Sequence, residues 1–411
     1  MKKTLIFILH TLNVGGGERH SITVANYLAQ NGYDVTVILI DDPVVRFKAD
    51  DRIKIIYLKN KFDDISCFDL TKNVSPCEII ESKTDDYSVD LIDRIKLNVF
   101  RHINIKRYQS KDSELYFRKN YINKLREYLS SRPDAFVISF MTVCNIVTAA
   151  ALEGLPNKGM FSEFTSPATE FPKEHYMNDI KRRYYQNDIG GIFQTEEERD
   201  FYTYLKDKRS YVIPNPVLGD YPERFVGERK KIIVNFCRLN KAKNLFLLAD
   251  AFALFSAEYP DYELHIYGEG ALKEEIESYI DDLGLKDKIR LLPFDTKLHG
   301  KIKDHAMFVS SSDYEGISNS MLEAMAIGLP VICTDCPAGG ARMVIEDHIN
   351  GILVPVRDKV AMYKAMKELI DDPALAEKLS VNAVSVKEKY SVENIGKMWA
   401  DALDREMSEK Q

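Results

Sequence analysis

The sequence predicts an α/β protein built from two doubly wound parallel sheets, one in each half of the chain. Three observations support this fold class. The 411 residues exceed what one ordinary hydrophobic core holds. Each half alternates apolar strands with segments of helical period or helical length. The first strand, TLIFIL, is a continuous apolar run, which is typical of a parallel strand covered by helices on both faces.

The first half begins as strand, glycine loop, helix and strand. TLIFIL (4–9) is followed by HTLNVGGG, by helical spacing from Glu18 to Asn31, and by YDVTVILI. Further strands are predicted at 136–140, 158–164 and 190–195, and VIPNPV, with two prolines, is an extended connector. We therefore expect a first domain at 1–214, whereas residues 43–130 show a less regular pattern.

The opening MKKTLIFILH resembles the start of a signal peptide, but the resemblance does not extend further along the chain. Its apolar run extends from Leu5 to Leu9, and no small-residue cleavage site follows. No apolar run is long enough to span a bilayer. We expect a buried first strand and a cytoplasmic protein.

A second alternation begins at Lys231 and predicts a second domain at 215–389. Its strands are KIIVNF, YELHIYG, KIRLLPF, AMFVSS, PVICTD and GILVPV. The last helical segment, about 390–411, is expected to pack back on the first domain. The default site lies in the cleft between two such domains, at the carboxyl ends of the strands.

Two motifs suit phosphate binding. In GGGERH, Gly16 and Gly17 precede a helix and let backbone amides approach an anion closely. The dinucleotide fingerprint is incomplete because His20 occupies the place of its third glycine. In NFCRLNKAKNL, Arg238 and Lys243 follow a strand and are able to grip a diphosphate from two sides. The alternatives are a flexible turn and two solvated surface cations.

The stretch SSSDYEGISNSMLEAMAIGLPVI contains Glu315 and Glu323 on either side of a helix start. Ser320 and Glu323 have the spacing of a capping box, in which the glutamate folds back on the helix start. The amides near Ser318 and Asn319 would equally suit a phosphate. Periodicity alone leaves both interpretations open.

The cysteines and acidic residues give no metal signal. Cys333 and Cys336 form one C-x-x-C at the end of an apolar strand, and no second pair completes a zinc site. We expect these thiols to fill the core. No D-x-D triplet occurs in the chain, which agrees with the site without metal or other cofactor that the family resemblance described below implies.

EGISNSMLE resembles the E-x7-E motif of retaining glycosyltransferase family 4, which has the GT-B fold. The flanking residues fit as well, from Asp313-Tyr-Glu-Gly to the EAMAIGLPVI that follows. Arg238, Lys243 and the motifs at Gly15–Glu18, Tyr267–Gly270 and Asn350–Gly351 are also similar to the family. The resemblance covers the second domain and both ends of the first, but not residues 43–130.

The resemblance implies roles for individual residues. Arg238 and Lys243 would neutralise the diphosphate of a UDP-sugar, Glu323 would bind the ribose, and Glu315 would lie beside the transferred sugar. Gly16 and Gly17 would close over the donor from the first domain. The donor loop would contribute Gly316, Ile317, Ser318 and Asn319. A family member of this kind transfers a hexose or N-acetylhexosamine to a glycan, often lipid-linked, in bacterial surface polysaccharide or glycoconjugate synthesis.

One position departs from the family pattern. Many relatives carry a histidine after a strand of the first domain, and here Phe164 stands in that place with Glu163 beside it. Glu163 is our candidate for part of the catalytic role, and His10 is a second candidate. The departure also leaves open a non-catalytic relative that binds a carbohydrate or another enzyme. A GT-B sugar-nucleotide epimerase, which needs no acceptor, is a third interpretation.

The stretch 94–126 is strongly basic within an acidic protein. It holds ten Lys/Arg and two Asp/Glu, whereas the whole chain has a net charge of −7. Five aromatic residues are interleaved with these charges. Such a stretch can lie on an anionic membrane surface, and a solvated helical face is the alternative. The acidic chain as a whole argues against nucleic acid as a partner.

Overall fold

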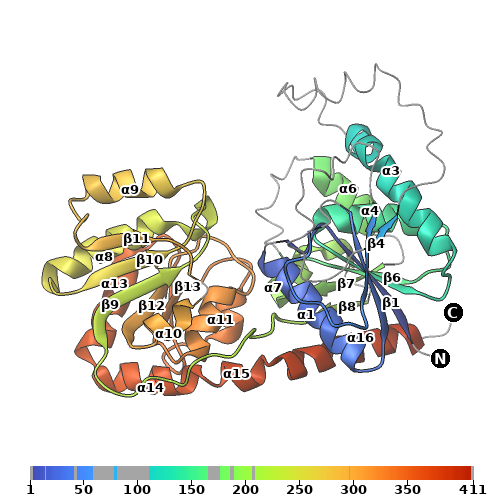
Figure 1. The fold of residues 1–411 in the computed structure, drawn as a ribbon. Coiled ribbons are helices and arrows are strands. Elements are labelled where there is room, and N and C mark those ends of the chain that lie inside the picture. Colours follow the sequence, from blue (N-terminus) through green and yellow to red (C-terminus); the bar gives the residue numbers. More distant parts are fainter. Residues whose placement is uncertain are drawn as a thin grey trace.

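The computed structural model describes residues 3–13, 15–40, 44–58, 78–80, 111–164, 176–185, 189–205, 209–295 and 297–408. These residues form two parallel sheets with helices on both faces (Figure 1). The predicted fold class is therefore confirmed. The predicted boundary at 214/215 lies in the segment that connects the two sheets.

The first sheet has eight strands in the order β4-β3-β2-β1-β5-β6-β7-β8. Every neighbouring pair in it is parallel. β3 and β4 fall between residues 43 and 130, where the sequence showed no regular pattern. The strands are β1 Thr4–Leu9, β2 Asp34–Leu39, β3 Lys54–Leu58, β4 Glu78–Ile80, β5 Phe136–Phe140, β6 Gly159–Ser162, β7 Ile189–Phe193 and β8 Ser210–Val212.

Side chains that alternate along β1 build two separate cores. Leu5 and Phe7 belong to the cluster that helix α1 (Gly16–Gln30) shares with the C-terminal helix α16 (Val392–Ser408). Ile6 and Ile8 belong to the cluster on the opposite face of the sheet. This double burial explains why β1 is apolar without interruption. The helices of this half are α1 Gly16–Gln30, α3 Lys111–Ser130, α4 Thr142–Leu152, α6 Tyr176–Tyr185 and α7 Glu196–Phe201.

The second sheet has six strands in the order β11-β10-β9-β12-β13-β14. From β9 the chain first adds β10 and β11 on one side of the sheet and then β12, β13 and β14 on the other side. The β9–β12 boundary is therefore the topological switch point at which such sheets bind ligands. The strands are β9 Lys230–Phe236, β10 Glu263–Tyr267, β11 Ile289–Leu292, β12 His305–Ser310, β13 Val331–Thr334 and β14 Ile352–Val354. The helices are α8 Leu245–Glu258, α9 Lys273–Asp282, α10 Leu298–Ile302, α11 Asn319–Ala326, α12 Gly340–Val344, α13 Lys359–Asp371, α14 Pro373–Ala383 and α15 Val386–Lys389.

The chain returns to the first sheet through α16 Val392–Ser408, drawn in red beneath the blue helix α1 (Figure 1). Trp399 is fully buried in the core that α16 shares with α1. Tyr33, just after α1, donates a hydrogen bond to Asp404. Tyr211 of β8 donates another, of 2.8 Å, to Glu406. The last helix is thus part of the first domain's core.

Most of the basic stretch 94–126 lies outside the described residues. Its part from residue 111 onward belongs to α3, where Tyr121 and Leu125 are buried against the first sheet's second core. Within the described part of the chain, no helix is both long enough and apolar enough to cross a membrane.

Candidate active site

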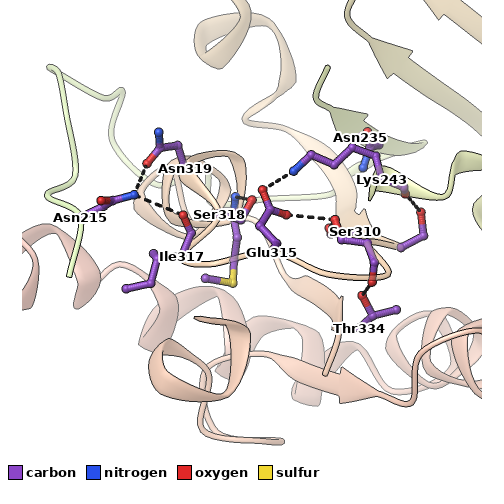
Figure 2. Close-up of polar contacts among 12 residues, drawn as sticks. Asn215, Asn235, Lys243, Ser310, Glu315, Ile317, Ser318, Asn319 and Thr334 are labelled. Carbon is purple, nitrogen blue, oxygen red and sulfur yellow. Dashed lines mark hydrogen bonds and ion pairs between the residues drawn. The ribbon is translucent and has the colours of Figure 1, made fainter. Parts of the chain in front are cut away.

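The loops after β9 and β12 are bound to each other at the switch point. Asn235 of β9 donates to the Val309 carbonyl at 2.8 Å. Beyond the strand ends, Ser311 Oγ donates to the Lys243 carbonyl, and the Asp313 amide donates to the Ala242 carbonyl, both at 2.8 Å. The short 3₁₀ turn Lys241–Lys243 is therefore fixed against the loop that carries Glu315 (Figure 2).

Lys243 and Glu315 form an ion pair at this junction. The ammonium contacts Glu315 Oε1, and Ser312 Oγ donates to Oε2 at 2.9 Å (Figure 2). The two side chains are 15% and 22% exposed. Burial by itself disfavours the charged ammonium, but the Glu315 carboxylate outweighs it and raises the pKa of Lys243 above its ordinary value. The structure thus brings together two of the predicted site residues.

Arg238 follows the carboxyl end of β9 and is exposed. Its charge acts on Glu18, the residue after the glycine loop of the first domain. Burial raises the pKa of the Glu18 carboxyl, and the charges of His10 and Arg238 oppose that rise. The two domains therefore face each other here with opposite charges. His10 is near this carboxylate, and a catalytic role for it stays a prediction.

The start of α11 excludes the capping-box interpretation of Glu323, and the role of a site carboxylate stays a prediction. The N-cap is Ser318, whose hydroxyl accepts from the Met321 amide at 3.4 Å. Ser320 is already inside the helix, so the capping box with Glu323 is not formed. Glu323 instead accepts from His299 Nε2 of α10 at 3.0 Å and pairs with Arg19 of α1 at 3.5 Å. Its carboxylate is held from both domains.

Glycines 16 and 17 permit the first domain to approach this site. A Cβ on Gly16 would lie 2.8 Å from Asn319 Nδ2, across the domain boundary. A Cβ on Gly17 would lie 3.1 Å from the Phe164 ring. A side chain at Gly16 would displace the end of the Asn319 side chain, and one at Gly17 would press on the Phe164 ring, so glycine permits the close approach at both positions. The glycine loop thus adjoins the start of α11.

The predicted residue Glu163 lies in the interior of the first domain. It is 1% exposed and accepts hydrogen bonds from Tyr185 and from Asn145 Nδ2, the latter at 3.2 Å. Lys181 forms an ion pair with it at 3.4 Å. The carboxylate is occupied by partners from its own domain, and a role at the reacting sugar stays a prediction.

Phe164 packs against apolar and aromatic neighbours. Its ring stacks on Phe140 with centroids 5.7 Å apart and meets the His20 ring edge-on at 4.9 Å. Burial lowers the pKa of His20 to about 3. His20 is therefore neutral at physiological pH and fills the core between α1 and α16.

The C-x-x-C cysteines are both buried beside the Lys243–Glu315 pair. Burial raises the pKa of Cys333 and raises that of Cys336 to about 12, and the Glu315 charge adds to both shifts. Such thiols are poor nucleophiles. In the part of the chain that the structure describes, no group of three or more His, Cys, Asp or Glu is arranged to hold a metal ion.

Four residues at the site gave no usable sequence signal. Arg19 follows the Gly15–Glu18 motif directly, but its positive charge alone does not predict an ion pair with a residue of the other domain. His299 lies on a short helix of ordinary composition. Gln194 ends a strand, and Asn215 lies in VIPNPV, where the two prolines suggested only a connector. All four contact residues of the Glu315–Glu323 stretch, or bind each other.

Comparison with known proteins places the chain in a family. Residues 222–386 match the family of glycosyl transferases group 1. An uncharacterized glycosyltransferase of Haemophilus influenzae is 25% identical over 410 residues, which are 98% of this chain and 100% of that protein. The N-acetylgalactosamine-N,N'-diacetylbacillosaminyl-diphospho-undecaprenol 4-alpha-N-acetylgalactosaminyltransferase of Campylobacter jejuni is 35% identical over 175 residues, 42% of this chain and 47% of that protein.

The fold likeness extends over the whole chain. A crystal structure of a TarM variant from S. aureus, in complex with fondaparinux, alpha-GlcNAc-glycerol and UDP, has a TM-score of 0.69. It is 17% identical and covers 98% of this chain and 100% of that one. The family match assigns residues 222–386 to the glycosyl transferases group 1, and the full-length likeness shows that the chain as a whole has the GT-B fold.

Proposed function

We propose that the protein is a retaining glycosyltransferase that uses a UDP-sugar to extend a lipid-linked glycan acceptor. The observation that carries the proposal is the charge arrangement at the switch point. Lys243 and Arg238 lie at the carboxyl end of β9, and the start of α11 lies on the neighbouring strand's loop. Cations and a helix start together form a site for a diphosphate.

The chemistry of the transfer matches these residues. As the bond to the anomeric carbon breaks, positive charge develops on the sugar and negative charge on the departing diphosphate. Lys243 and Arg238 stabilise the diphosphate, so no metal is needed for this step. A diphosphate also competes with Glu315 for the Lys243 ammonium. Donor binding thereby frees the Glu315 carboxylate to face the developing positive charge.

The relatives support the choice of donor and acceptor. The Campylobacter enzyme acts, by its name, on a sugar linked to diphospho-undecaprenol. The TarM structure holds UDP. We extend both to this chain: a UDP-sugar as donor, a hexose or N-acetylhexosamine as the group transferred, and a lipid-linked saccharide as acceptor.

The test is transfer by the purified protein, after a panel of nucleotide sugars has been screened for thermal stabilisation. UDP-sugars are expected to stabilise the protein and to support transfer with retention of the anomeric configuration. Glu315→Gln is expected to lower the rate by about 10²-fold or more, the scale for one well-placed electrostatic group, with UDP affinity nearly unchanged. Glu323→Gln is expected to weaken donor binding instead.

Binding of a UDP-sugar without transfer to any lipid-linked acceptor would contradict the enzyme proposal. That result would favour the non-catalytic relative, which Phe164 at the histidine position suggests. Conversion of the nucleotide sugar without an acceptor would favour the epimerase.

We also propose that the stretch 94–126 contacts an anionic membrane on which the acceptor resides. Its net positive charge is the support, since basic segments bind anionic lipid by charge. Sedimentation with anionic vesicles is expected at low salt and is expected to weaken as ionic strength rises. Changing Arg101, Lys106 and Arg107 to glutamate is expected to abolish it. Equal sedimentation of this triple variant and the wild type would contradict membrane contact by this stretch and would favour the alternative, a solvated helical face.

A further inference from the structure

A short segment of the first domain, Gln194 to Glu198, docks onto the donor loop of the second. Thr195 Oγ1 donates to the Ala338 carbonyl at 2.6 Å. The Ile317 amide donates to Gln194 Oε1 at 3.1 Å. Glu197 pairs with Arg342 at 2.8 Å. The segment follows β7 directly, so the first sheet positions it rigidly against the loop between Glu315 and α11.

Asn215 of the connector completes this contact. Its Nδ2 donates to the Ile317 carbonyl at 3.3 Å and to Asn319 Oδ1 at 3.2 Å (Figure 2). Its Oδ1 accepts from Gln194 Nε2 at 2.7 Å. Gln194 and Asn215 are 4% and 5% exposed. Two buried side-chain amides, bonded to each other, therefore hold both backbone polar groups of Ile317.

Holding the Ile317 carbonyl also sets the direction of the next amide. The peptide unit between Ile317 and Ser318 is planar and trans, so its N–H points opposite to its carbonyl. The carbonyl points toward Asn215, which lies on one side of the loop, whereas the Glu315–Lys243 pair lies on the other (Figure 2). The Ser318 N–H is thereby aimed away from the first domain's connector, toward the side on which the cation lies.

The loop has little freedom to adopt another orientation. A Cβ on Gly316 would lie 2.4 Å from Gln194 Oε1 and 2.8 Å from Glu198 Oε1, so the first domain presses against its Cα. From the other side, a Cβ on Gly340 would lie 1.9 Å from the Gly316 carbonyl oxygen. Glycines at both positions permit this packing, and the packing fixes the loop.

We propose that Gln194 and Asn215 are positioning residues for the donor diphosphate. They do not touch the donor: they hold the Ile317 backbone so that the Ser318 amide, and the helix start behind it, face the phosphates. Because Gln194 belongs to the first domain and the loop to the second, diphosphate binding is coupled to the contact between the domains. The inference rests on the proposed function, in which this loop binds a UDP-sugar.

The test compares UDP with uridine, which lacks the phosphates, by calorimetry. Gln194→Met has similar volume and removes the acceptor for the Ile317 amide. Asn215→Asp is isosteric and replaces the donor with a carboxylate that repels the Ile317 carbonyl. Each variant is expected to weaken UDP binding by about tenfold, on the scale of one lost hydrogen bond to a charged group. Uridine affinity is expected to stay at the wild-type value.

Glu197→Gln is the matched control. It weakens another contact between the same segment and the second domain, but Glu197 is 44% exposed and pairs with Arg342 rather than with the donor loop. Both affinities are expected to match wild type. Melting temperature is measured for all three variants, so that a loss of folded protein is separated from a loss of affinity.

The outcomes are distinct. Equal weakening of UDP and uridine, or lower melting temperature with unchanged UDP affinity, would show a purely structural role and overturn the inference. If wild-type protein bound UDP no better than uridine, that result would contradict the diphosphate site itself and therefore the proposed function.

Discussion

The Lys243–Glu315 pair allows a sharp test of the site, because each residue has a different expected role while both share one contact. Removing one partner of a buried ion pair costs about 3–5 kcal/mol of unfolding free energy, since an uncompensated charge stays behind. Here both side chains keep some exposure, and Ser312 continues to donate to Glu315 at 2.9 Å. That hydrogen bond offsets about 1 kcal/mol, so Lys243→Met is expected to destabilise the fold by about 2–4 kcal/mol.

Glu315→Gln is expected to have a smaller effect, because the neutral amide still accepts from Lys243. The double variant Lys243→Met/Glu315→Gln removes both charges. It is expected to be more stable than the sum of the single changes predicts, by about 1–2 kcal/mol, the usual coupling of residues in contact. Urea unfolding of the four proteins measures this coupling.

Binding separates the two roles. Lys243→Met is expected to weaken UDP affinity by about 1.5–3 kcal/mol, the value for hydrogen bonds to charged groups, and Arg238→Ala by a similar amount. Glu315→Gln is expected to bind UDP at least as tightly as wild type, because a neutral amide competes with the diphosphate for the ammonium less strongly than the carboxylate does. Additive stabilities in the double variant would refute the ion pair. Unchanged UDP affinity in both the Lys243 and Arg238 variants would refute the diphosphate clamp.

Three further predictions follow from the same geometry. Burial raises the pKa of Glu198 to about 8. Between pH 4.5 and 8 the folded chain therefore holds a proton that the unfolded chain has lost. The free energy of unfolding is expected to fall by about 1.4 kcal/mol per pH unit across this window and to level off above it. Glu198→Gln is expected to remove that slope in denaturation at several pH values, and an unchanged slope would exclude Glu198 as its source. Gly316→Ala is expected to reduce UDP affinity and melting temperature, whereas Gly300→Ala, where a Cβ meets open space, is expected to leave UDP affinity unchanged; equal effects would contradict the tight docking. Transfer activity is expected to survive EDTA, and a loss restored by Mn²⁺ or Mg²⁺ would contradict side-chain cations as the neutralising charges.

The sequence predicted the sheets well because burial on both faces leaves an unmistakable apolar pattern. β1 and β12 are apolar because helices cover both faces of each sheet. β3 and β4 were missed, since they lie within the charged segment 43–130, whose apolar runs are short. Propensity in such a segment is a weak guide, and pairing with a neighbouring strand decides the outcome.

The site was predicted in part for a similar reason. The glycine loop, the strand-end cations and the E-x7-E spacing are local patterns that a sequence displays. The capping-box interpretation of Glu323 fails only because the helix begins two residues earlier, at the Ser318 cap. Partners from the other domain or from the connector, such as Arg19 and Asn215, are set by how the two domains meet. No local spacing encodes that meeting.

The return of α16 to the first domain makes that domain discontinuous in sequence. Residues 392–408 supply Trp399 and Leu403, both fully buried, to a core whose strands lie some 200–390 positions earlier in the chain. The polypeptide therefore crosses between the halves twice, once before β9 and once before α16. A truncation after α15 would uncover the side of α1 on which His20 and Tyr27 meet α16, so the last helix supports the helix that begins at the glycine loop. Expression of the two halves as separate contiguous fragments would likewise divide one core, and after a nick between β8 and β9 only the non-covalent packing of α16 would tie the first sheet to the second fragment.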